Sequence, residues 1–303
     1  MSIRTPERTP PVAASPEPTQ FEVFEPLAES APVMWREAQH LCSDHCRAYH
    51  GVWQYLLLLD VIRGLRSDRA FLIQTLRERL RSERIERVLV SGTADYAMPA
   101  CVLAAARLEN QSPSITVVDR CATPLAISDW YARQVSADFE TVQSDILEYR
   151  GAAPFDLICT HSFIARFEPE VRNRLLCHWR DLLRPGGWVL TSHRARPGLD
   201  AERVRYDDAT IERFVASVRT AADNFAAPLG VSREDLLREA RKYAQAKSNF
   251  NLRSGDEVAA HFTHNGFEIV ARDELVSNSM TGDHPPVQAS SGSYRVRLLA
   301  RRI

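Results

Sequence analysis

Short apolar runs alternate with helical stretches between Arg87 and Ser192, and this alternation restricts the possible folds more than any other feature. The runs are rich in Val and Ile: Val88–Ser91, Ser114–Val118, Phe139–Gln143, Phe155–Thr160 and Trp188–Ser192. The helical stretches between them are Met98–Leu108, Leu125–Gln134 and Glu170–Leu183. Apolar strands separated by helices predict a mostly parallel sheet covered on both faces, which is a doubly wound α/β fold.

Further helices are expected on both sides of this alternation. Apolar residues at spacings of three and four between Ala31 and Arg81 predict two or three helices, which we assign to an amino-terminal helical lid over residues 31–84. Residues 1–30 begin with a stretch rich in Pro, Thr, Ser and Glu and are expected to be a disordered tail.

The last third of the chain departs from simple alternation. Within a domain of residues 85–303, polar-faced helices predict a helical insertion at 200–250, and a helix and two strands follow it. These elements are expected at Asp207–Phe225, Ser232–Lys247, Gly255–Asn265, Glu268–Leu275 and Tyr294–Ala300. A loop of Ser, Gly, Pro and Asn over Ser277–Gly292 joins the two strands.

Charge and cysteine content narrow the classes of partner and the compartment. The 303 residues hold 38 Lys and Arg against 39 Asp and Glu, so no global field attracts nucleic acid, and we expect a small-molecule substrate. Six scattered cysteines without a secretory signal predict reduced thiols in the cytoplasm. No apolar stretch approaches the roughly 20 residues that a membrane span requires. A monomer or a homodimer is expected.

Three features lie directly after predicted strands, where doubly wound sheets bind their ligands. The turn Ser91–Pro99 contains Gly92, which allows backbone N–H groups to approach a ligand closely. Asp119 ends the second strand, and an acid there can accept both ribose hydroxyls of an adenosine. Asp145 can take an adenine amino group while Ile146 packs on the ring. Taken singly, each has a simpler explanation as an ordinary turn residue or helix cap.

Together these motifs resemble those of class I S-adenosylmethionine (SAM) dependent methyltransferases. The resemblance covers roughly Glu86 to Ser192, and its most specific part is Leu182–Leu190, where Pro185-Gly186-Gly187 turns from a helix into a buried strand. It implies a Rossmann-like, seven-stranded sheet of order 3-2-1-4-5-7-6 with SAM as cofactor. The implied cofactor-binding residues are Gly92, Thr93, Ala94, Asp95, Met98, Asp119, Arg120, Cys121, Asp145, Ile146, Thr160, His161 and Ser162.

The glycine-rich first motif departs from the family pattern. Val90 stands where an acid is usual, and Ala94 and Tyr96 stand where glycines are usual, so that only Gly92 remains. The expected function is methyl transfer from SAM to a small-molecule acceptor. The alternatives are SAM-dependent chemistry that releases methylthioadenosine, through aminocarboxypropyl transfer or cyclisation, and a non-catalytic protein with a methyltransferase-like fold.

Histidines and aromatic residues are the candidates for catalysis and substrate binding. His161 is the candidate general base, because imidazole titrates near neutrality, although a purely structural role stays open. The residues expected to bind substrate are Tyr49, His50, Trp53, His193 and Tyr243. Arg194 and Arg196 beside His193 can hold an acidic substrate.

Cys42, Cys46 and His50 recur every four residues and place three possible metal ligands on one helical face. No second group of ligands with matching spacing follows in the sequence. We therefore predict no metal site and favour a helix that covers the active site.

Overall fold

The protein is described by a computed structural model over residues 23–276 and 292–303. Its central sheet has seven strands in the order β3-β2-β1-β4-β5-β9-β8, with β9 and its partners antiparallel and the other pairs parallel. This confirms the predicted order, since β9 and β8 occupy the places of the seventh and sixth strands. The strands are β1 (Arg87–Ser91), β2 (Ser114–Asp119), β3 (Phe139–Gln143), β4 (Phe155–His161), β5 (Leu183–Ala195), β8 (Phe267–Val276) and β9 (Tyr294–Arg302).

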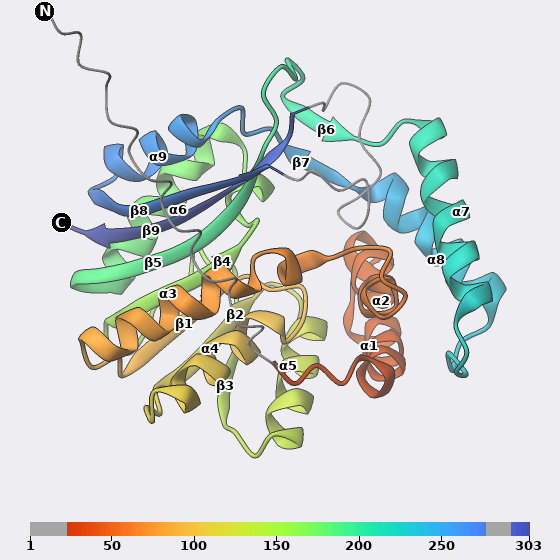
Figure 1. The fold of residues 1–303 in the computed structure, drawn as a ribbon, viewed down its shortest axis with the longest axis horizontal. Helices are drawn as coiled ribbons and strands as arrows, with labels where there is room; N and C mark the ends of the chain where they lie inside the picture. The colour runs from red at the N-terminus through yellow and green to blue at the C-terminus, as the bar shows by residue number, and fades with distance from the viewer. Residues whose placement is uncertain (1–22, 277–291) are drawn as a thin grey trace, which may run out of the picture.

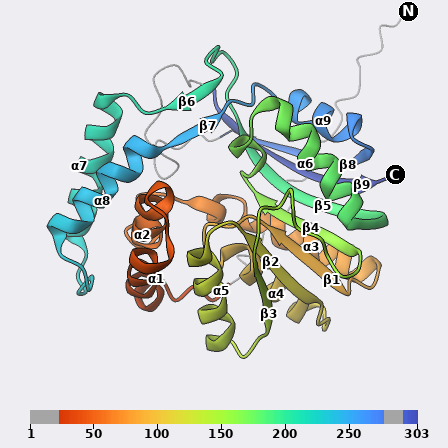
Figure 2. The ribbon, with the colours of Figure 1, turned by 180° about the vertical axis from the view of Figure 1, so that it is seen from behind.

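Helices cover both faces of this sheet, as Figures 1 and 2 show from opposite sides. One face carries α3 (Arg69–Ser82), α4 (Ala97–Leu108) and α5 (Ala122–Gln134), and the other carries α6 (Pro169–Leu182) and α9 (Gly255–His264). Successive strand residues point to opposite faces, so Val88 and Val90 join the first core while Leu89 joins the second. This double burial explains why the strands are apolar throughout.

The turn predicted at Pro185-Gly186-Gly187 is an irregularity at the start of β5. Helix α6 ends at Leu182, and Gly186 has φ +74°, a backbone conformation that glycine adopts without steric cost. A Cβ on Gly187 would lie 3.1 Å from the carbonyl oxygen of Asp156, so this position also requires a small residue. The pairing of β4 with β5 shifts register at the same place.

The amino-terminal helices and the insertion meet beside the carboxyl ends of the strands. Helices α1 (Leu27–Leu41) and α2 (Asp44–Leu58) precede α3, and α1 begins before the predicted tail boundary at residue 30. Most of that tail, residues 1–22, and nearly all of the predicted loop 277–292 lie outside the described residues. The insertion contains α7 (Asp208–Asn224) and α8 (Arg233–Ala246), flanked by an unpredicted pair of short strands, β6 (Arg203–Arg205) and β7 (Ser248–Phe250).

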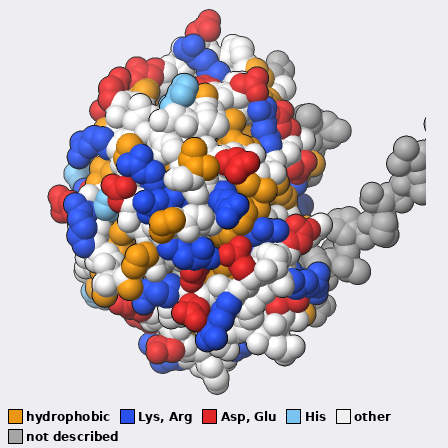
Figure 3. All heavy atoms as spheres, turned by 90° about the vertical axis from the view of Figure 1, so that its left-hand side faces the viewer, with side chains coloured by type: hydrophobic (Ala, Val, Ile, Leu, Met, Phe, Trp, Pro, Cys, Tyr) orange, Lys and Arg blue, Asp and Glu red, His pale blue; other side chains and the backbone are white. Residues whose placement is uncertain are grey.

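Two properties of the surface bear on partners. Acidic and basic side chains are interspersed on the face shown in Figure 3, in keeping with the net charge of -1. Within residues 23–276 and 292–303, no helix combines the length and apolar character that crossing a bilayer requires.

Candidate active site

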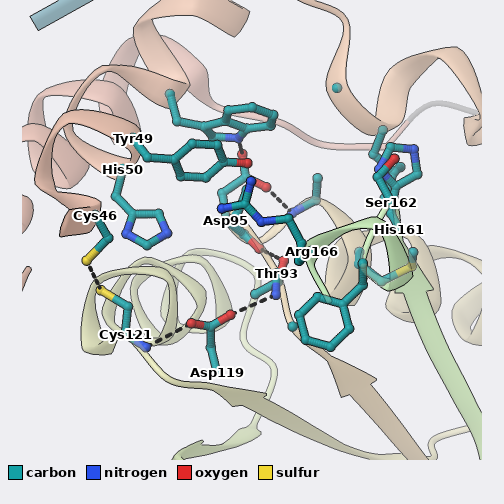
Figure 4. Close-up of a pocket in the computed structure, with 18 of the residues that line it drawn as sticks. Cys46, Tyr49, His50, Thr93, Asp95, Asp119, Cys121, His161, Ser162 and Arg166 are labelled. Carbon is teal, nitrogen blue, oxygen red and sulfur yellow. Dashed lines mark hydrogen bonds between the residues drawn. The ribbon is translucent and has the colours of Figure 1, made fainter. Parts of the chain in front are cut away.

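A cavity of about 860 Å³ lies at the carboxyl ends of the strands, enclosed by α2 and by residues of the insertion (Figure 4). Ligand pockets typically measure about 300–1,000 Å³, so this one has room for a nucleoside and a second small molecule. It brings together nearly all the predicted site residues: Tyr49, His50, Trp53, Gly92, Thr93, Ala94, Asp95, Met98, Asp119, Arg120, Cys121, Asp145, Ile146, His161, Ser162 and Tyr243.

Asp119 and Asp145 line this cavity from the ends of neighbouring strands. Each carboxylate oxygen of Asp119 accepts one backbone N–H, from Thr93 at 3.1 Å and from Cys121 at 2.8 Å, and has further lone pairs for a ligand. Burial raises the pKa of Asp119, against the effect of these N–H donors. Asp145 accepts the backbone N–H of Leu147 at 2.9 Å and also lines the cavity. These carboxylate acceptors suit the hydroxyls of a ribose and an exocyclic amine, which donate hydrogen bonds.

In the turn after β1, another side chain of the protein lies against Gly92. Gly92 has φ +68°, and a Cβ placed on it would lie 2.2 Å from the ring of Phe163. The ring of Phe163 therefore fills the space beside Gly92 that the absence of a side chain leaves free. The same ring also lines the cavity. Tyr96 does not intrude: its ring is buried in the core, stacked on Tyr131 at a centroid distance of 4.5 Å.

Asp95 lines the cavity and also links two of the helices that surround it. Its side chain accepts the Trp53 indole N–H and the Ala97 backbone N–H, each at 2.9 Å, and so ties α2 to the start of α4. Burial raises its pKa to about 6, against the lowering effect of the Ala97 N–H. Its carboxylate is consequently committed to contacts within the protein.

An aromatic wall closes the side of the cavity opposite the strand ends. Tyr49 on α2 stacks with Trp53 at 5.2 Å and with Tyr243 of α8 at 5.5 Å between ring centroids. Burial raises the pKa of Tyr49 to about 12, so its hydroxyl is neutral near pH 7. The guanidinium of Arg166 lies 5.5 Å from the centroid of the Tyr49 ring and, in Figure 4, between Tyr49 and Thr93.

His161 is paired with an acid that the sequence did not single out. Its Nε2 lies 2.8 Å from a carboxylate oxygen of Asp68, a fully buried residue 93 positions earlier. Burial opposes the charge on Asp68, but Arg295, His161 and Arg297 around it hold its pKa well below the usual range. An ionised Asp68 places a proton on Nε2 and fixes the orientation of the ring. In sequence, Asp68 looks like an ordinary cap before a helix.

The main chain directly after His161 is constrained too. Ser162 has φ +56°, a conformation that is uncommon for residues other than glycine and is often found at functional sites. Its N–H donates to the carbonyl oxygen of Ser192 at 2.7 Å, and its hydroxyl accepts from Arg295 at 2.9 Å. These contacts hold the end of β4 toward the cavity.

The structure places two predicted site residues outside the cavity. Thr160 lies within β4, is fully buried, and donates its hydroxyl hydrogen bond to the carbonyl oxygen of Ser91 at 2.8 Å. His193 lies within β5, because that strand continues to Ala195 rather than ending at Ser192. It is fully buried beside Thr191 Oγ1, at 2.9 Å, and burial lowers its pKa to about 3. Neither side chain lines the cavity.

Several cationic side chains line the cavity, and of these only Arg120, Arg194 and Arg196 were predicted from the sequence. Arg166 follows His161 by five residues, and Lys247 and Arg295 come from distant parts of the chain. Arg196 is 8% exposed, and burial followed by the charge of Arg194 lowers its pKa to about 10. The cavity therefore favours negatively charged ligands near its Arg196 side.

Beside Asp119, three cysteines and a histidine gather at the edge of the cavity. Cys42, Cys46, His50 and Cys121 place their Sγ atoms and a ring nitrogen within 4.8 Å of one another. Helical spacing indicates only the first three as possible ligands; Cys121 has no such signal, because it lies 75 residues beyond Cys46. Burial opposes a charge on His50, but hydrogen bonds with Cys121 and Cys46 raise its pKa to about 9.

Comparison with known proteins gives a likeness in structure only. No protein-family model and no curated protein sequence matches the chain. A SAM-dependent methyltransferase from Clostridium acetobutylicum is similar over 82% of this chain and 98% of its own, with TM-score 0.50 and 11% identity. The cyclase SpnF is similar over 76% and 79%, with TM-score 0.50 and 13% identity.

A third structure, the N-methyltransferase NodS from Bradyrhizobium japonicum in complex with S-adenosylhomocysteine, has TM-score 0.48 and 16% identity over 90% of this chain and 98% of its own. The first two structures, each with TM-score 0.50, and the strand order support the assignment of the fold. One of them is described as a cyclase, so the architecture alone does not fix the reaction. On these grounds, the chain has the fold of the class I SAM-dependent methyltransferases.

Proposed function

We propose that this chain is an enzyme that transfers a methyl group from SAM to a small-molecule acceptor. The observation that carries the proposal is that Asp119, Asp145 and Ile146 line the same cavity as His161 and the aromatic wall. The cavity volume of about 860 Å³ allows a cofactor and an acceptor to lie side by side.

The residues present fit the cofactor. Asp119 would hold the ribose hydroxyls, since each of its oxygens has capacity beyond the backbone N–H that it already accepts. Asp145 would accept from the adenine amine and Ile146 would pack on the ring. When bound, SAM supplies a methyl group already activated on a sulfonium, so orientation of the acceptor contributes most of the remaining rate gain.

His161 would receive a proton where the acceptor must lose one. Asp68 keeps Nε2 protonated, so the incoming proton would go to Nδ1, and the ionised carboxylate would stabilise the resulting imidazolium. Asp68 thus acts as a positioning residue.

The acceptor that suits the lining is small and anionic. Arg166, Arg194, Arg196, Lys247 and Arg295 supply cations, and Tyr49 and Tyr243 supply flat apolar surface. A carboxylate or phosphate on a compact, partly apolar molecule matches both properties.

One observation favours a second candidate, SAM-dependent chemistry other than methyl transfer. Phe163 fills the approach at Gly92, which distinguishes this turn from the pattern of the family's first motif. A displaced amino-acid end of the cofactor would suit aminocarboxypropyl transfer or cyclisation.

Product analysis separates these candidates. The full-length chain is incubated with SAM and a panel of small hydroxyl, thiol and amine compounds, each in carboxylate-bearing and uncharged forms, and the nucleoside products are separated by mass spectrometry. S-adenosylhomocysteine formed in the presence of carboxylate-bearing acceptors supports methyl transfer. Methylthioadenosine supports the second candidate. Formation of neither, with S-adenosylhomocysteine still bound, would contradict both and leave a non-catalytic binding protein.

A further inference from the structure

The cysteine and histidine cluster beside the cavity has the composition and spacing of a metal centre. Its four donors come from three parts of the fold: Cys42 at the end of α1, Cys46 and His50 on one face of α2, and Cys121 directly before α5. Helical spacing alone brings Cys46 and His50 together. The packing of α1 on α2 and on α5 adds the other two.

The distances between donors agree with four ligands around one ion. Cys121 Sγ lies 3.5 Å from Cys42 Sγ and 3.6 Å from Cys46 Sγ, and Cys42 Sγ lies 3.4 Å from His50 Nδ1. Tetrahedral zinc with Zn–S bonds of about 2.3 Å and Zn–N bonds of about 2.0 Å separates its ligands by roughly 3.5–3.8 Å. These three separations are within a few tenths of an ångström of the tetrahedral values, and all four donor atoms lie within 4.8 Å of one another, so only small movements are needed to place them around one ion.

A disulfide explains the cluster less well than a metal. Cys121 is almost equally distant from two cysteines, whereas a disulfide would join it to only one of them at about 2.05 Å. Either bond would leave the third thiol and His50 unused. A shared central ion uses all four groups at once.

Neighbouring residues form hydrogen bonds with the ligand residues of the cluster. Cys42 Sγ lies 3.0 Å from the hydroxyl of Thr123, and the Cys121 backbone N–H donates to Asp119 at 2.8 Å. Cys42, His50 and Cys121 are all less than 10% exposed, so water competes weakly for the site. Hydrogen bonds of this kind orient ligands and tune a metal site.

We propose that Cys42, Cys46, His50 and Cys121 bind a structural zinc ion that fastens the amino-terminal lid to the loop carrying Asp119. Four protein ligands leave no open position, which is typical of a structural rather than a catalytic zinc. Binding releases the protons of the three thiols and of His50 to solvent, and the resulting three thiolates and neutral imidazole neutralise the zinc ion and leave a net charge of -1 on the site. The proposal stands independently of the reaction that the enzyme carries out.

The test measures metal on the full-length chain, purified in reductant from zinc-supplemented culture and desalted. Elemental analysis should find about one zinc per chain. The variants Cys121→Ser and Cys46→Ala should each lose most of the zinc. Because Cys46 is only half-buried, its substitution is expected to disturb the fold less than that of Cys121. Cys177→Ser is the matched control, since that half-buried cysteine on α6 contacts Asn265 far from the cluster; it should keep its zinc.

A second measurement avoids substitutions altogether. The chelated wild-type chain is titrated with cobalt(II), which should give the intense visible absorption of tetrahedral thiolate coordination and then lose it when zinc is added. Absence of bound zinc and of that spectrum in the reduced, folded wild-type chain would overturn the proposal. Zinc loss from Cys177→Ser equal to that from Cys121→Ser would also overturn it.

Discussion

Replacing Asp119 with alanine tests the cofactor site at its best-defined residue. The carboxylate faces the cavity with two oxygens, and in the proposed complex each accepts one ribose hydroxyl. Hydrogen bonds to a charged group contribute about 1.5–3 kcal/mol each. Loss of two at the lower end removes about 3 kcal/mol, which raises the Kd roughly 100-fold.

Isothermal titration calorimetry with S-adenosylhomocysteine measures this change directly. Asp129→Ala is the matched control, because that carboxylate lies on α5 outside the cavity, where it accepts a hydrogen bond from Thr141 at 3.2 Å. It should leave the affinity unchanged. Circular dichroism of both variants checks that the fold persists. A folded Asp119→Ala protein that binds within about threefold of wild type would refute the assignment of the ribose site.

Three further perturbations address other parts of the site. Gly92→Ala should lower the free energy of unfolding by about 2 kcal/mol more than Gly198→Ala. Both glycines have positive φ, but only a Cβ on Gly92 would clash with an aromatic ring. Equal losses of stability in urea titrations would contradict this. Asp95, with its pKa raised from 3.8 to about 6, stabilises the fold when protonated. Relative to Asp95→Asn, wild type should therefore lose on the order of 3 kcal/mol as the pH rises through that interval. A constant difference would show that burial does not disfavour the ionised carboxylate. His161→Gln should lower kcat about 100-fold or more and remove one ionisation from its pH profile, with a smaller loss for Asp68→Asn; an unchanged profile would assign His161 a structural role.

The central sheet and the acids at its strand ends could be predicted because their signals are local. Apolar runs and the helices between them reveal themselves within windows of about ten residues, and a parallel strand exposes the residue at its carboxyl end. Asp119 and Asp145 follow from that rule without knowledge of any contact. The same rule failed at His193, because the strand continues past Ser192 and buries the residue that was expected to follow it.

Features built from distant residues could not be read from the sequence. The pairing of Asp68 with His161 spans 93 positions and depends on how the segment before α3 packs against β4 and β9. Cys121 lies beside Cys42 only because α1 packs on α5, and no residue spacing in the sequence indicates that packing. Phe163 lies over Gly92 because strands β1 and β4 are neighbours in the sheet.

The most direct test of the account is a crystal structure of the full-length chain with S-adenosylhomocysteine. We expect the ribose hydroxyls within hydrogen-bond distance of the Asp119 carboxylate, the adenine ring against Ile146 with its amine toward Asp145, and the sulfur facing the space between His161 and Tyr49. A ligand bound elsewhere, or an adenosine that leaves Asp119 and Asp145 without contact, would contradict the proposed cofactor site and the methyltransferase function that depends on it.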